Sequence, residues 1–403
     1  MNDGFDVLIV GGGLVGASLA IALDASGLRV ALAEAAPPRA DLQPSYDERN
    51  LALAQASVNA LGTLGVLDAR TPAVPIRRIH TSRRGDFGAV RLDAAALGFD
   101  AFGAVLPARE LGNALLARLD ACTALERFAP AQAVGVAPDA GAIAVGLRVG
   151  DEHVELRTRL LVGADGSDSF VRGALGIKVR REDYLQSAFV TTLTTERPLD
   201  GTAYERFTES GPVALLPLGG ARAGLVLTVP REQAAEVAAL DDDAFLALVH
   251  ERFGWRAGRF SRPGRRRPYP LARTLAARTT APRAVLVGNA AQTVHPIGAQ
   301  GFNLGLRDAL TLAELLREAA AARADPCGAD LLARYAERRR ADRDATTAFS
   351  DDLVRLMGAD VLPLRVLRSL GMHALDRLES LKRRFALRGM GYRGDVPASA
   401  LPR

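Results

Sequence analysis

The sequence predicts an α/β protein with a Rossmann-like dinucleotide-binding domain, an interleaved antiparallel β-sheet domain and a C-terminal helical region. Three observations predict this fold class. A strand, a glycine-rich turn and a helix follow one another near the N-terminus, strand-like alternation extends over residues 186–230, and helical periodicity dominates after residue 300. The chain has 403 residues, 48% of them hydrophobic and 24% charged, and can therefore bury a substantial core.

The first element is the segment VLIVGGGLVGASLAIAL, which predicts a buried strand, a tight turn and a helix. Gly11, Gly13 and Gly16 form the pattern G-x-G-x-x-G at the turn. The first glycine makes the turn, the second lets the backbone approach a pyrophosphate, and the third lets the helix pack closely on the strand. Glu34 ends the next strand, 18 positions after the third glycine, where it can accept ribose hydroxyls. This unit predicts a site for one dinucleotide; the alternative is a glycine-rich corner that binds nothing.

The remaining elements alternate along the chain. Apolar spacing predicts helices over residues 46–70 and 107–119, and residues 142–161 predict strands that form a hairpin. The predicted domain boundaries are 1–75, 105–182 and 270–325 for the discontinuous dinucleotide-binding domain, 76–104 and 183–269 for the β-rich domain, and 326–403 for the C-terminal helical region.

Charge and cysteine content narrow the class of protein. The formal net charge of +5 permits contact with acidic lipid or nucleic acid without requiring either, and no recognised nucleic-acid module supports a nucleic-acid partner. Cys122 and Cys327 are far apart, so no disulfide framework is predicted and a reducing compartment fits best. The acidic cluster DEHVE at residues 151–155 is expected to be a solvated turn, and no metal is expected. The N-terminal segment lacks a basic start and a cleavage site, so we expect a cytoplasmic protein.

Two further motifs follow predicted strands. LLVGADGSDSFVR, residues 160–172, runs from a buried strand into Asp165 and Gly166. GNAAQTVHPIGAQGFNLG, residues 288–305, follows the apolar run AVLV and precedes a helix. Its glycines and small residues let the backbone lie against a flat ring and an anion, and Pro296 fixes the chain beside the ring. The alternative is an ordinary helix N-terminus.

In order, the three motifs resemble the dinucleotide fingerprint, the DG motif and the GD motif of single-component flavoprotein aromatic hydroxylases. The similarity is greater still to the ubiquinone-biosynthesis branch, in stretches such as RRIHTSRRGDFGAVRL and YERFTESGPVALLPL, and it covers most of the chain. The resemblance implies FAD as the bound cofactor, NADPH or NADH as the reductant and O2 as the oxidant. The chain departs from the commonest pattern at Asn289, where most relatives have Asp; an amide can still hydrogen-bond a ribityl hydroxyl.

The resemblance also assigns roles to individual residues. Arg49 and Arg109 match cofactor-contacting arginines, with surface helix charges as the alternative. His295 and Pro296 are the candidate catalytic residues, although a histidine in a tight turn often satisfies a backbone partner instead. The implied cofactor-binding residues are Gly11, Gly13, Gly16, Glu34, Arg49, Arg109, Asp165, Gly166, Asn289, Pro296, Gly298, Gly301 and Asn303. The implied substrate-pocket residues, for which plain sheet core is the alternative, are Phe207, Leu216 and Pro217.

The reaction that the resemblance implies is hydroxylation of a polyprenylated phenol, of the 2-polyprenyl-6-methoxyphenol type, in ubiquinone biosynthesis. The nicotinamide would reduce FAD, dioxygen would form a flavin C4a-hydroperoxide, and its distal oxygen would attack the phenol ring. Water must be excluded, because the peroxide otherwise decays. The sequence assigns no phenol-deprotonating base, and it leaves open the ring carbon, the prenyl length, the nicotinamide and the oligomeric state.

Two other functions share the same motifs. One is an FAD-dependent hydroxylase of a small soluble aromatic, and the other is a non-catalytic flavin-binding scaffold of a biosynthetic complex. A tryptophan-type halogenase is disfavoured, because its W-x-W signature cannot exist with the single tryptophan, Trp255.

Basic runs near the C-terminus indicate which partners the protein could contact. Residues 381–388, LKRRFALR, combine basic side chains with Leu381, Phe385 and Leu387 at helical spacing, which suits an interfacial helix. A lipophilic phenol dissolves in the bilayer, so we expect peripheral contact with the inner face of the cytoplasmic membrane, or docking on other ubiquinone-biosynthesis proteins. The alternative is a solvated helix face.

Overall fold

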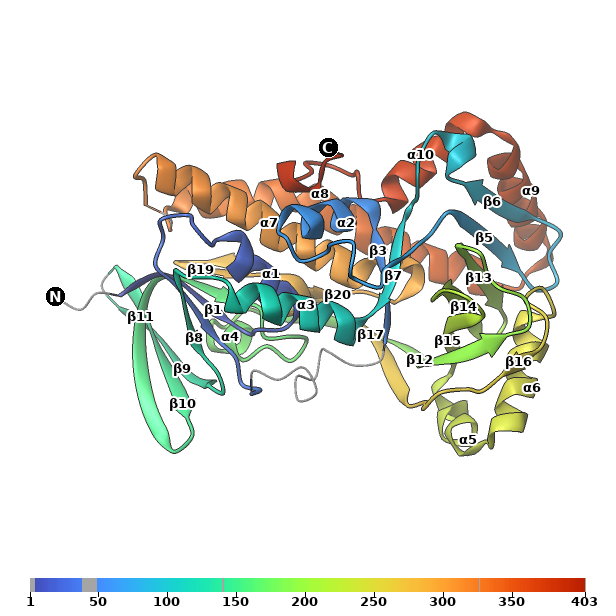
Figure 1. Cartoon of the computed structure of the whole chain (residues 1–403), viewed down its shortest axis with the longest axis horizontal. Helices are drawn as coiled ribbons and strands as arrows, with labels where there is room; N and C mark the ends of the chain where they lie inside the picture. The colour runs from blue at the N-terminus through green and yellow to red at the C-terminus, as the bar shows by residue number, and fades with distance from the viewer. Residues whose placement is uncertain (1–3, 38–48, 140, 326, 403) are drawn as a thin grey trace.

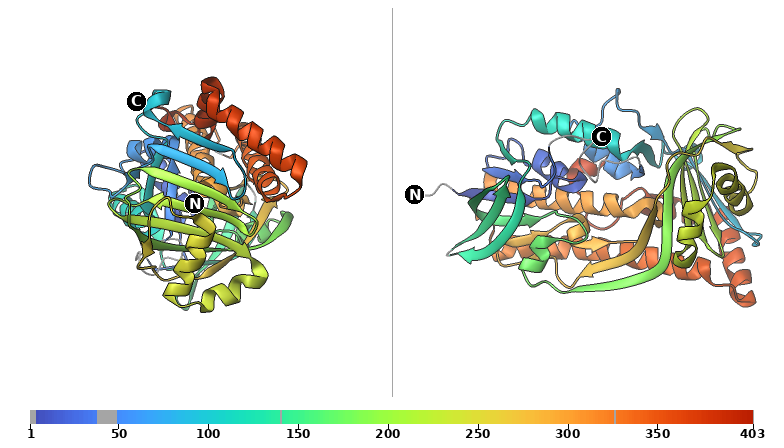
Figure 2. Two further views of the ribbon diagram at one scale, coloured as in Figure 1. Left: turned by 90° about the vertical axis from the view of Figure 1, so that its right-hand side faces the viewer. Right: turned by 90° about the horizontal axis from the view of Figure 1, so that it is seen from below.

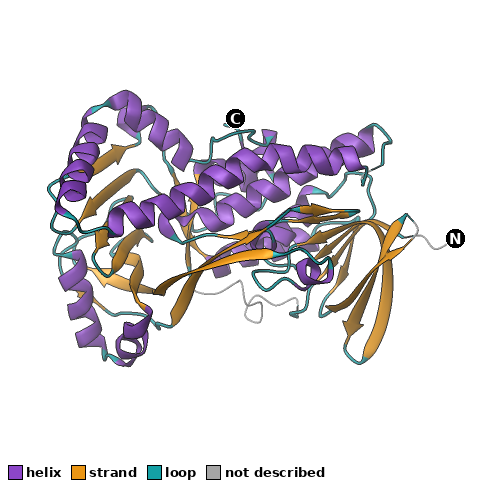
Figure 3. Cartoon of the chain, turned by 180° about the vertical axis from the view of Figure 1, so that it is seen from behind, coloured by secondary structure: helices purple, strands orange, loops and turns teal. Residues whose placement is uncertain are grey.

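The computed structural model describes residues 4–37, 49–139, 141–325 and 327–402. Two halves, each built on a β-sheet, lie side by side (Figure 1). The helices α7 (Gln300–Ala321) and α8 (Ala329–Gly358) pack against each other, and α8 contacts strands of both halves. Figure 3 shows these two long helices from behind. The arrangement confirms the predicted fold class, an α/β protein with an interleaved antiparallel sheet.

The first half contains a mainly parallel sheet, which we call the dinucleotide sheet. Its strand order is β18-β19-β11-β1-β2-β8, and β9 and β10 extend β11 as an antiparallel ribbon. Val7 and Ile9 of β1 face a core with α1, α3 and α7, whereas Leu8 and Val10 face the ribbon and α4. Burial on both faces explains why β1 is a continuous apolar run. The bounds are β1 Phe5–Val10, β2 Val30–Ala33, β8 Leu125–Phe128, β9 Gln132–Asp139, β10 Ala142–Val149, β11 Glu152–Gly163, β18 Thr280–Ala281, β19 Ala284–Leu286, α1 Leu14–Ala22, α3 Ala108–Asp120 and α4 Phe170–Ala174.

The second half contains the large antiparallel sheet, in the order β20-β17-β12-β15-β14-β13-β5-β6. One departure from antiparallel pairing occurs where β13 runs parallel to β5. One face of the sheet packs against α5 and α6, and the other faces the C-terminal parts of α8, α9 and α10. The bounds are β5 Arg78–Arg83, β6 Ala89–Asp93, β12 Val179–Thr195, β13 Thr202–Thr208, β14 Gly211–Pro217, β15 Arg222–Pro230, β16 Phe260–Ser261, β17 Pro268–Ala276, β20 Gln292–Thr293, α5 Ala234–Ala239, α6 Asp242–Phe253, α9 Leu362–Arg377 and α10 Glu379–Gly389.

The helix predicted over residues 46–70 is confirmed only over part of its length: residues 46–48 lie outside the described residues, and residues 64–70 are not helical. Asn50–Ala54 form strand β3, which pairs with β7 (Gly103–Pro107), and only Gln55–Thr63 form the helix α2. The segment NLALA suits a strand as well as a helix, and its pairing with β7 decides between the two conformations. The third strand of this small sheet is β4, Val74–Pro75. The helix predicted over 107–119 and the hairpin predicted within 142–161 are confirmed.

Two long strands connect the halves. β12 and β17 pair with each other over most of their length and extend from one half into the other, as the right-hand view of Figure 2 shows. The proposed boundary at residues 182 and 183 falls inside β12, and the boundary at 270 falls inside β17. The division into domains stays a prediction, and these two strands belong to both.

Candidate functional site

A single cavity of about 1300 Å³ extends from the end of β1 to the large antiparallel sheet. Most of the residues predicted from the sequence line it. These are Gly11, Gly13, Glu34, Arg49, Asp165, Gly166, Phe207, Leu216, Asn289, His295, Pro296, Gly298, Gly301 and Asn303. Gly16, Arg109 and Pro217 are outside the lining. The structure therefore brings together residues that are up to 292 positions apart in the chain.

The glycine-rich turn forms one end of the cavity. Gly11 has a φ of +106°, a backbone conformation that residues with a side chain rarely adopt. A Cβ there would lie 2.4 Å from the carbonyl oxygen of Ala164. A Cβ on Gly16 would lie 1.9 Å from the carbonyl oxygen of Gly11. Gly16 thus acts by close packing beneath the turn, which explains why it does not line the cavity. Gly13 is the N-cap of α1, whose first amides point toward the cavity end.

Glu34 directly follows β2 and lines the cavity beside this turn. Its Oε2 accepts a hydrogen bond from the Gly12 amide at 2.5 Å, and its Oε1 accepts one from the Ala36 amide at 2.7 Å. These bonds orient the carboxylate, and each oxygen keeps a second lone pair for a ligand hydroxyl.

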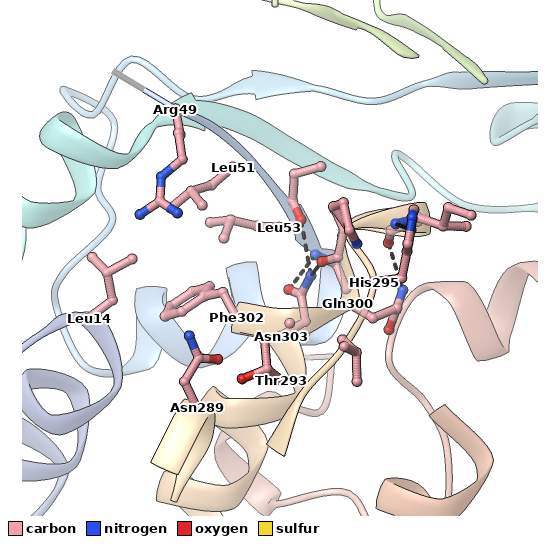
Figure 4. Close-up of a pocket in the computed structure, with 18 of the residues that line it drawn as sticks. Leu14, Arg49, Leu51, Leu53, Asn289, Thr293, His295, Gln300, Phe302 and Asn303 are labelled. Carbon is pink, nitrogen blue, oxygen red and sulfur yellow. Dashed lines mark hydrogen bonds between the residues drawn. The ribbon is translucent and has the colours of Figure 1, made fainter. Parts of the chain in front are cut away.

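The two arginines differ in position. Arg49 precedes β3, is half-buried and lines the cavity, with its guanidinium carbon 5.8 Å from the centre of the Tyr269 ring. Figure 4 shows its side chain at the same opening as Leu14 and Phe302. Arg109 lies in the first turn of α3, where its side chain is 48% exposed and its Nε is 3.9 Å from Glu110. Its predicted cofactor contact stays a prediction.

The DG motif forms a compact turn after β11. Asp165 accepts hydrogen bonds from the Ser169 hydroxyl at 2.5 Å and from the Val171 amide at 3.0 Å, while Gly166 adopts a φ of +84°. Arg172 is buried and donates to the carbonyls of Ser167 and Ala290, at 2.8 and 3.0 Å. Arg172 therefore ties this turn to the segment that begins at residue 288, a contact that the motifs alone do not reveal.

The segment GNAAQTVHPIGAQGFNLG crosses the middle of the cavity. Gly288 has a φ of +59° and lies under Gly305, where a Cβ would be 2.9 Å from the Gly288 Cα. Asn289 and Pro296 are exposed toward the cavity, and Gly298 adopts a left-handed conformation at φ +65° just before α7. A flat wall of backbone and small side chains results, which suits an aromatic ring system.

Asn303 holds this wall in place. Its Oδ1 accepts a hydrogen bond from the Ala54 amide at 2.8 Å, and its Nδ2 donates to the carbonyls of Ala52 and Ala299 at 3.0 and 2.7 Å. Figure 4 shows these bonds converging on the side chain. Asn303 therefore fixes the turn before α7 against β3, and its side chain is 1% exposed.

His295 is enclosed by protein. Its Nδ1 accepts a hydrogen bond from the Ile297 amide at 3.2 Å, its Nε2 lies 3.4 Å from the Gln186 amide oxygen, and its ring packs edge-on against Tyr184. Burial lowers the pKa of His295 to about 4, so the ring is neutral near pH 7. This geometry favours the alternative stated for it, a histidine that satisfies a backbone partner.

The far end of the cavity is a largely apolar chamber against the large antiparallel sheet. Phe207 of β13 and Leu216 of β14 face it, whereas Pro217 ends β14 and points elsewhere. Phe349 and Leu353 of α8, with Met390 beyond α10, cover the chamber from the opposite side.

Sequence reasoning missed the acidic residue of this chamber, Glu205 on β13. Strand periodicity could have indicated it, because Glu205 is two positions from Phe207 and so shares its face. Burial raises the pKa of the Glu205 carboxyl to about 7.

The residues at the first end fit FAD. The turn at Gly11 is packed so closely on the Ala164 backbone that it admits no side chain, α1 directs amides toward the cavity end, and Glu34 presents a fixed carboxylate beside them. The wall between Asn289 and Gly298 would take the ring, and it opens onto the apolar chamber. Within the described ranges, no group of three acidic, histidine or cysteine side chains could hold a metal ion.

Comparisons with known proteins agree with this geometry. Residues 4–350 match the protein family described as FAD binding domain. The chain is 38% identical over 390 residues to ubiquinone hydroxylase UbiL of Rhodospirillum rubrum, covering 96% of this chain and 89% of that protein. It is 32% identical over 390 residues to 3-demethoxyubiquinol 3-hydroxylase of Escherichia coli, covering 95% and 97%.

A solved structure with a similar fold is p-nitrophenol 4-monooxygenase PnpA of Pseudomonas putida. The TM-score is 0.81, with 98% of this chain and 99% of that chain covered, and the sequences are 20% identical. This likeness supports the fold of the whole chain.

Proposed function

This chain belongs to the FAD-binding domain family and is an FAD-dependent monooxygenase of its ubiquinone-biosynthesis branch, and from this premise we propose that it hydroxylates a polyprenylated phenol of the 2-polyprenyl-6-methoxyphenol type. NAD(P)H and O2 are the co-substrates of this class of enzyme. The observation that carries the proposal is the continuous cavity, because it joins a dinucleotide cradle to an apolar chamber without an intervening wall. Bound FAD would supply the oxygen-transfer chemistry, for which we propose a C4a-hydroperoxide.

The residues of the chain position the reactants. Gly11, Gly13 and Glu34 would hold the adenosine half, and Asn289, together with the backbone of the turn after Pro296, would hold the ring half. We assign His295 and Asn303 to positioning, because their polar atoms are engaged by backbone partners of that wall. Phe207, Leu216 and the apolar residues of α8 would exclude water from the chamber.

Anaerobic stopped-flow reduction by NADPH, followed by mixing with O2 and a short-chain 2-prenyl-6-methoxyphenol, tests this proposal. We expect the phenol to accelerate flavin reduction and to be recovered as a hydroxylated product, whose ring position NMR then identifies. The same assay with 2-methoxyphenol tests the alternative substrate, a small soluble aromatic. Equal coupling of NADPH oxidation to product with both phenols would favour that alternative, because the apolar chamber would then contribute nothing to recognition.

We also propose that the protein takes its substrate from a lipid surface. The exposed apolar side chains of α9, α10 and the residue between them form what we call the leucine face: Leu362, Val366, Leu367, Leu370, Leu378, Leu381 and Phe385. Leu362 is 70% and Leu367 is 65% exposed, which is unusual for clustered leucines. Phe385 belongs to this face and also lines the cavity, so the chamber and the leucine face adjoin at α10.

Basic side chains accompany the leucine face. Arg377 and Arg384 are exposed and form no ion pair with any residue in the described part of the chain, whereas Lys382 lies 3.5 Å from Asp376 and Arg383 donates to the carbonyl of Leu97. Arg377 and Arg384 can therefore meet anionic headgroups, which supports peripheral contact. No helix among the described residues is long and apolar enough to cross a bilayer. Other ubiquinone-biosynthesis proteins are the alternative occupants of the same face.

A further inference from the structure

Alternation along β13 sends every second side chain into the chamber. Ala203, Glu205 and Phe207 line the cavity and share one face of the strand. In the register of the sheet, Glu205 lies between Thr81 of β5 and Ala214 of β14, which also line the cavity. A carboxyl group thus stands within an otherwise uncharged row of side chains.

Glu205 is separated from the other acidic groups of the cavity. Glu34, Asp165 and Asp168 are at the dinucleotide end, in or after strands of the other sheet. Among the described residues, the Glu205 side chain forms no hydrogen bond or ion pair, unlike Glu34 and Asp165. The side chain is half-buried where it lines the chamber, and an acceptor there without a protein partner can take a hydrogen bond from a bound ligand.

The turn that would carry the flavin ring lies close to the row of side chains that contains Glu205. Ala203 and Phe207, which flank Glu205 on its face, belong to the same hydrophobic cluster as Ile297, and Ile297 directly follows Pro296. A ring bound in the chamber would therefore lie within reach of both the Glu205 carboxyl and the turn at Pro296.

We propose that the Glu205 carboxylate accepts the hydroxyl proton of the phenol substrate and orients its ring toward the flavin. The phenol O–H bond breaks, an O–H bond forms on a Glu205 carboxylate oxygen, and the electron pair stays on the phenolate oxygen and delocalises into the ring. The ring is then richer in electrons when it receives oxygen from the O2 activated by bound FAD. After transfer, the C–H bond at the hydroxylated ring carbon breaks and its electron pair restores the aromatic ring. The proton held on Glu205 returns to the phenol oxygen, and the C–H proton goes to the second oxygen atom of O2, which leaves as water with the electrons supplied by NAD(P)H. The inference rests on the proposed function, since it requires a phenol substrate.

The charge of Glu205 changes near neutral pH. Burial raises its pKa to about 7, and no neighbouring charge opposes this shift. A carboxyl with this pKa can both take up and release a proton at working pH. The other titratable or charged groups that line the cavity are Glu34, Arg49, Asp165, Asp168, Tyr204, Tyr269, His295, Arg388 and Arg393.

The test compares the holoenzymes of Glu205→Gln and Glu209→Gln. Glutamine keeps the size and polarity of the side chain but cannot take up the proton. Glu209 is an exposed acid in the turn after β13, so its substitution makes the same charge change outside the cavity. FAD content and substrate-free reduction by NADPH are measured first, followed by product yield with the parent phenol and with a fluorinated phenol of lower pKa.

For Glu205→Gln we expect normal FAD content, normal substrate-free reduction and a loss of product formation of roughly 100-fold with the parent phenol. The loss relative to wild type should shrink with the fluorinated phenol, because that phenol ionises without a base. Wild-type activity should rise with pH through about 7, and this rise should be absent in Glu205→Gln. Glu209→Gln should match wild type throughout.

Equal product formation by the two variants, or an equal loss with both phenols, would overturn the role of Glu205 while leaving the proposed function intact. If wild type hydroxylates no phenol, the proposed function and this inference both fail. A folding defect is recognised separately by thermal unfolding. Since the raised pKa means that ionisation of Glu205 destabilises the fold as pH rises through about 7, Glu205→Gln should be at least as stable as wild type above that pH.

Discussion

At the scale of single residues, burial affects two cavity side chains in opposite ways. It lowers the pKa of His295 to about 4 and raises that of Glu205 to about 7. His295 therefore stays neutral throughout the neutral range and holds its tautomer through the Ile297 amide. Glu205 changes charge near neutral pH, so pH dependence in that range should belong to Glu205.

The close packing of the glycines in the first turn leads to a prediction at the scale of single residues. Gly16→Ala would place a Cβ 1.9 Å from the Gly11 carbonyl oxygen, so strand and helix must separate. We expect a loss of about 1–3 kcal/mol in the free energy of unfolding and a lower FAD content in the purified protein. Gly62→Ala is the matched control, because Gly62 lies in α2 with nothing within 4 Å of its Cβ position. Retention of FAD by Gly16→Ala at the level of Gly62→Ala would contradict the packing role of Gly16.

At the scale of elements, a buried ionic network joins α7 to α8. Asp342 accepts hydrogen bonds from Arg307 at 2.6 Å and from Arg339 at 2.7 Å, and Arg339 also donates to Asp308 at 2.7 Å. Asp308 in turn accepts from the Gly288 amide at 3.3 Å. The network therefore links α8 to the segment that would carry the flavin.

Removal of one charge from this network should lower the free energy of unfolding. Burial alone would raise the pKa of Asp342, but the guanidiniums of Arg307 and Arg339 lower it to about 2. Asp342→Asn leaves two buried arginines with less counter-charge, and we expect a loss of about 3–5 kcal/mol in the free energy of unfolding, measured with urea. Asp352→Asn, on the exposed side of α8, should have little effect.

The sign of the pH dependence follows from the lowered pKa. The stabilisation by Asp342 is fully present above its ordinary value of 3.8 and is lost as pH falls toward about 2. The unfolding free energies of wild type and Asp342→Asn should therefore converge between these two pH values. A constant difference down to the lower limit would show that packing, not charge, accounts for the loss.

Elements also differ in how well the sequence predicts them. The helix α3 and the hairpin of β10 and β11 carry a clear local period and were predicted. The strand β3 was missed, because NLALA suits either conformation and only its pairing with β7 decides. The pairing partners of β3 lie 49 to 57 positions away and leave no local pattern.

At the scale of the whole molecule, the large antiparallel sheet separates two different surfaces. Its face toward α5 and α6 is a closed core, and its other face forms the chamber that α8 and α10 cover. The leucine face lies on the outside of this cover. Phe385 of α10 belongs both to the leucine face and to the cavity lining, so the two adjoin there.

Membrane contact is tested at this scale by co-sedimentation with vesicles of phosphatidylglycerol and phosphatidylethanolamine. A fully buried leucine contributes about 1.5–3 kcal/mol, so Leu367→Ser with Leu370→Ser should weaken binding roughly tenfold or more. Arg377→Glu with Arg384→Glu should weaken it mainly at low salt. Trp255→Ser removes an exposed aromatic side chain on the α6 side of the sheet and should leave binding unchanged. If neither double variant changes partitioning, the leucine face is not a lipid-binding surface.

The sequence by itself determined the dinucleotide unit, the three cofactor motifs and the alternation of strand and helix. These depend on backbone conformation and local period, which glycines, prolines and apolar spacing encode directly. Only the tertiary structure decided that β3 is a strand, that His295 is enclosed, that Arg109 and Pro217 lie outside the cavity lining, and that Glu205 stands alone in an apolar chamber. These properties depend on partners distant in the chain, because burial, pairing and pKa arise only where the folded segments meet.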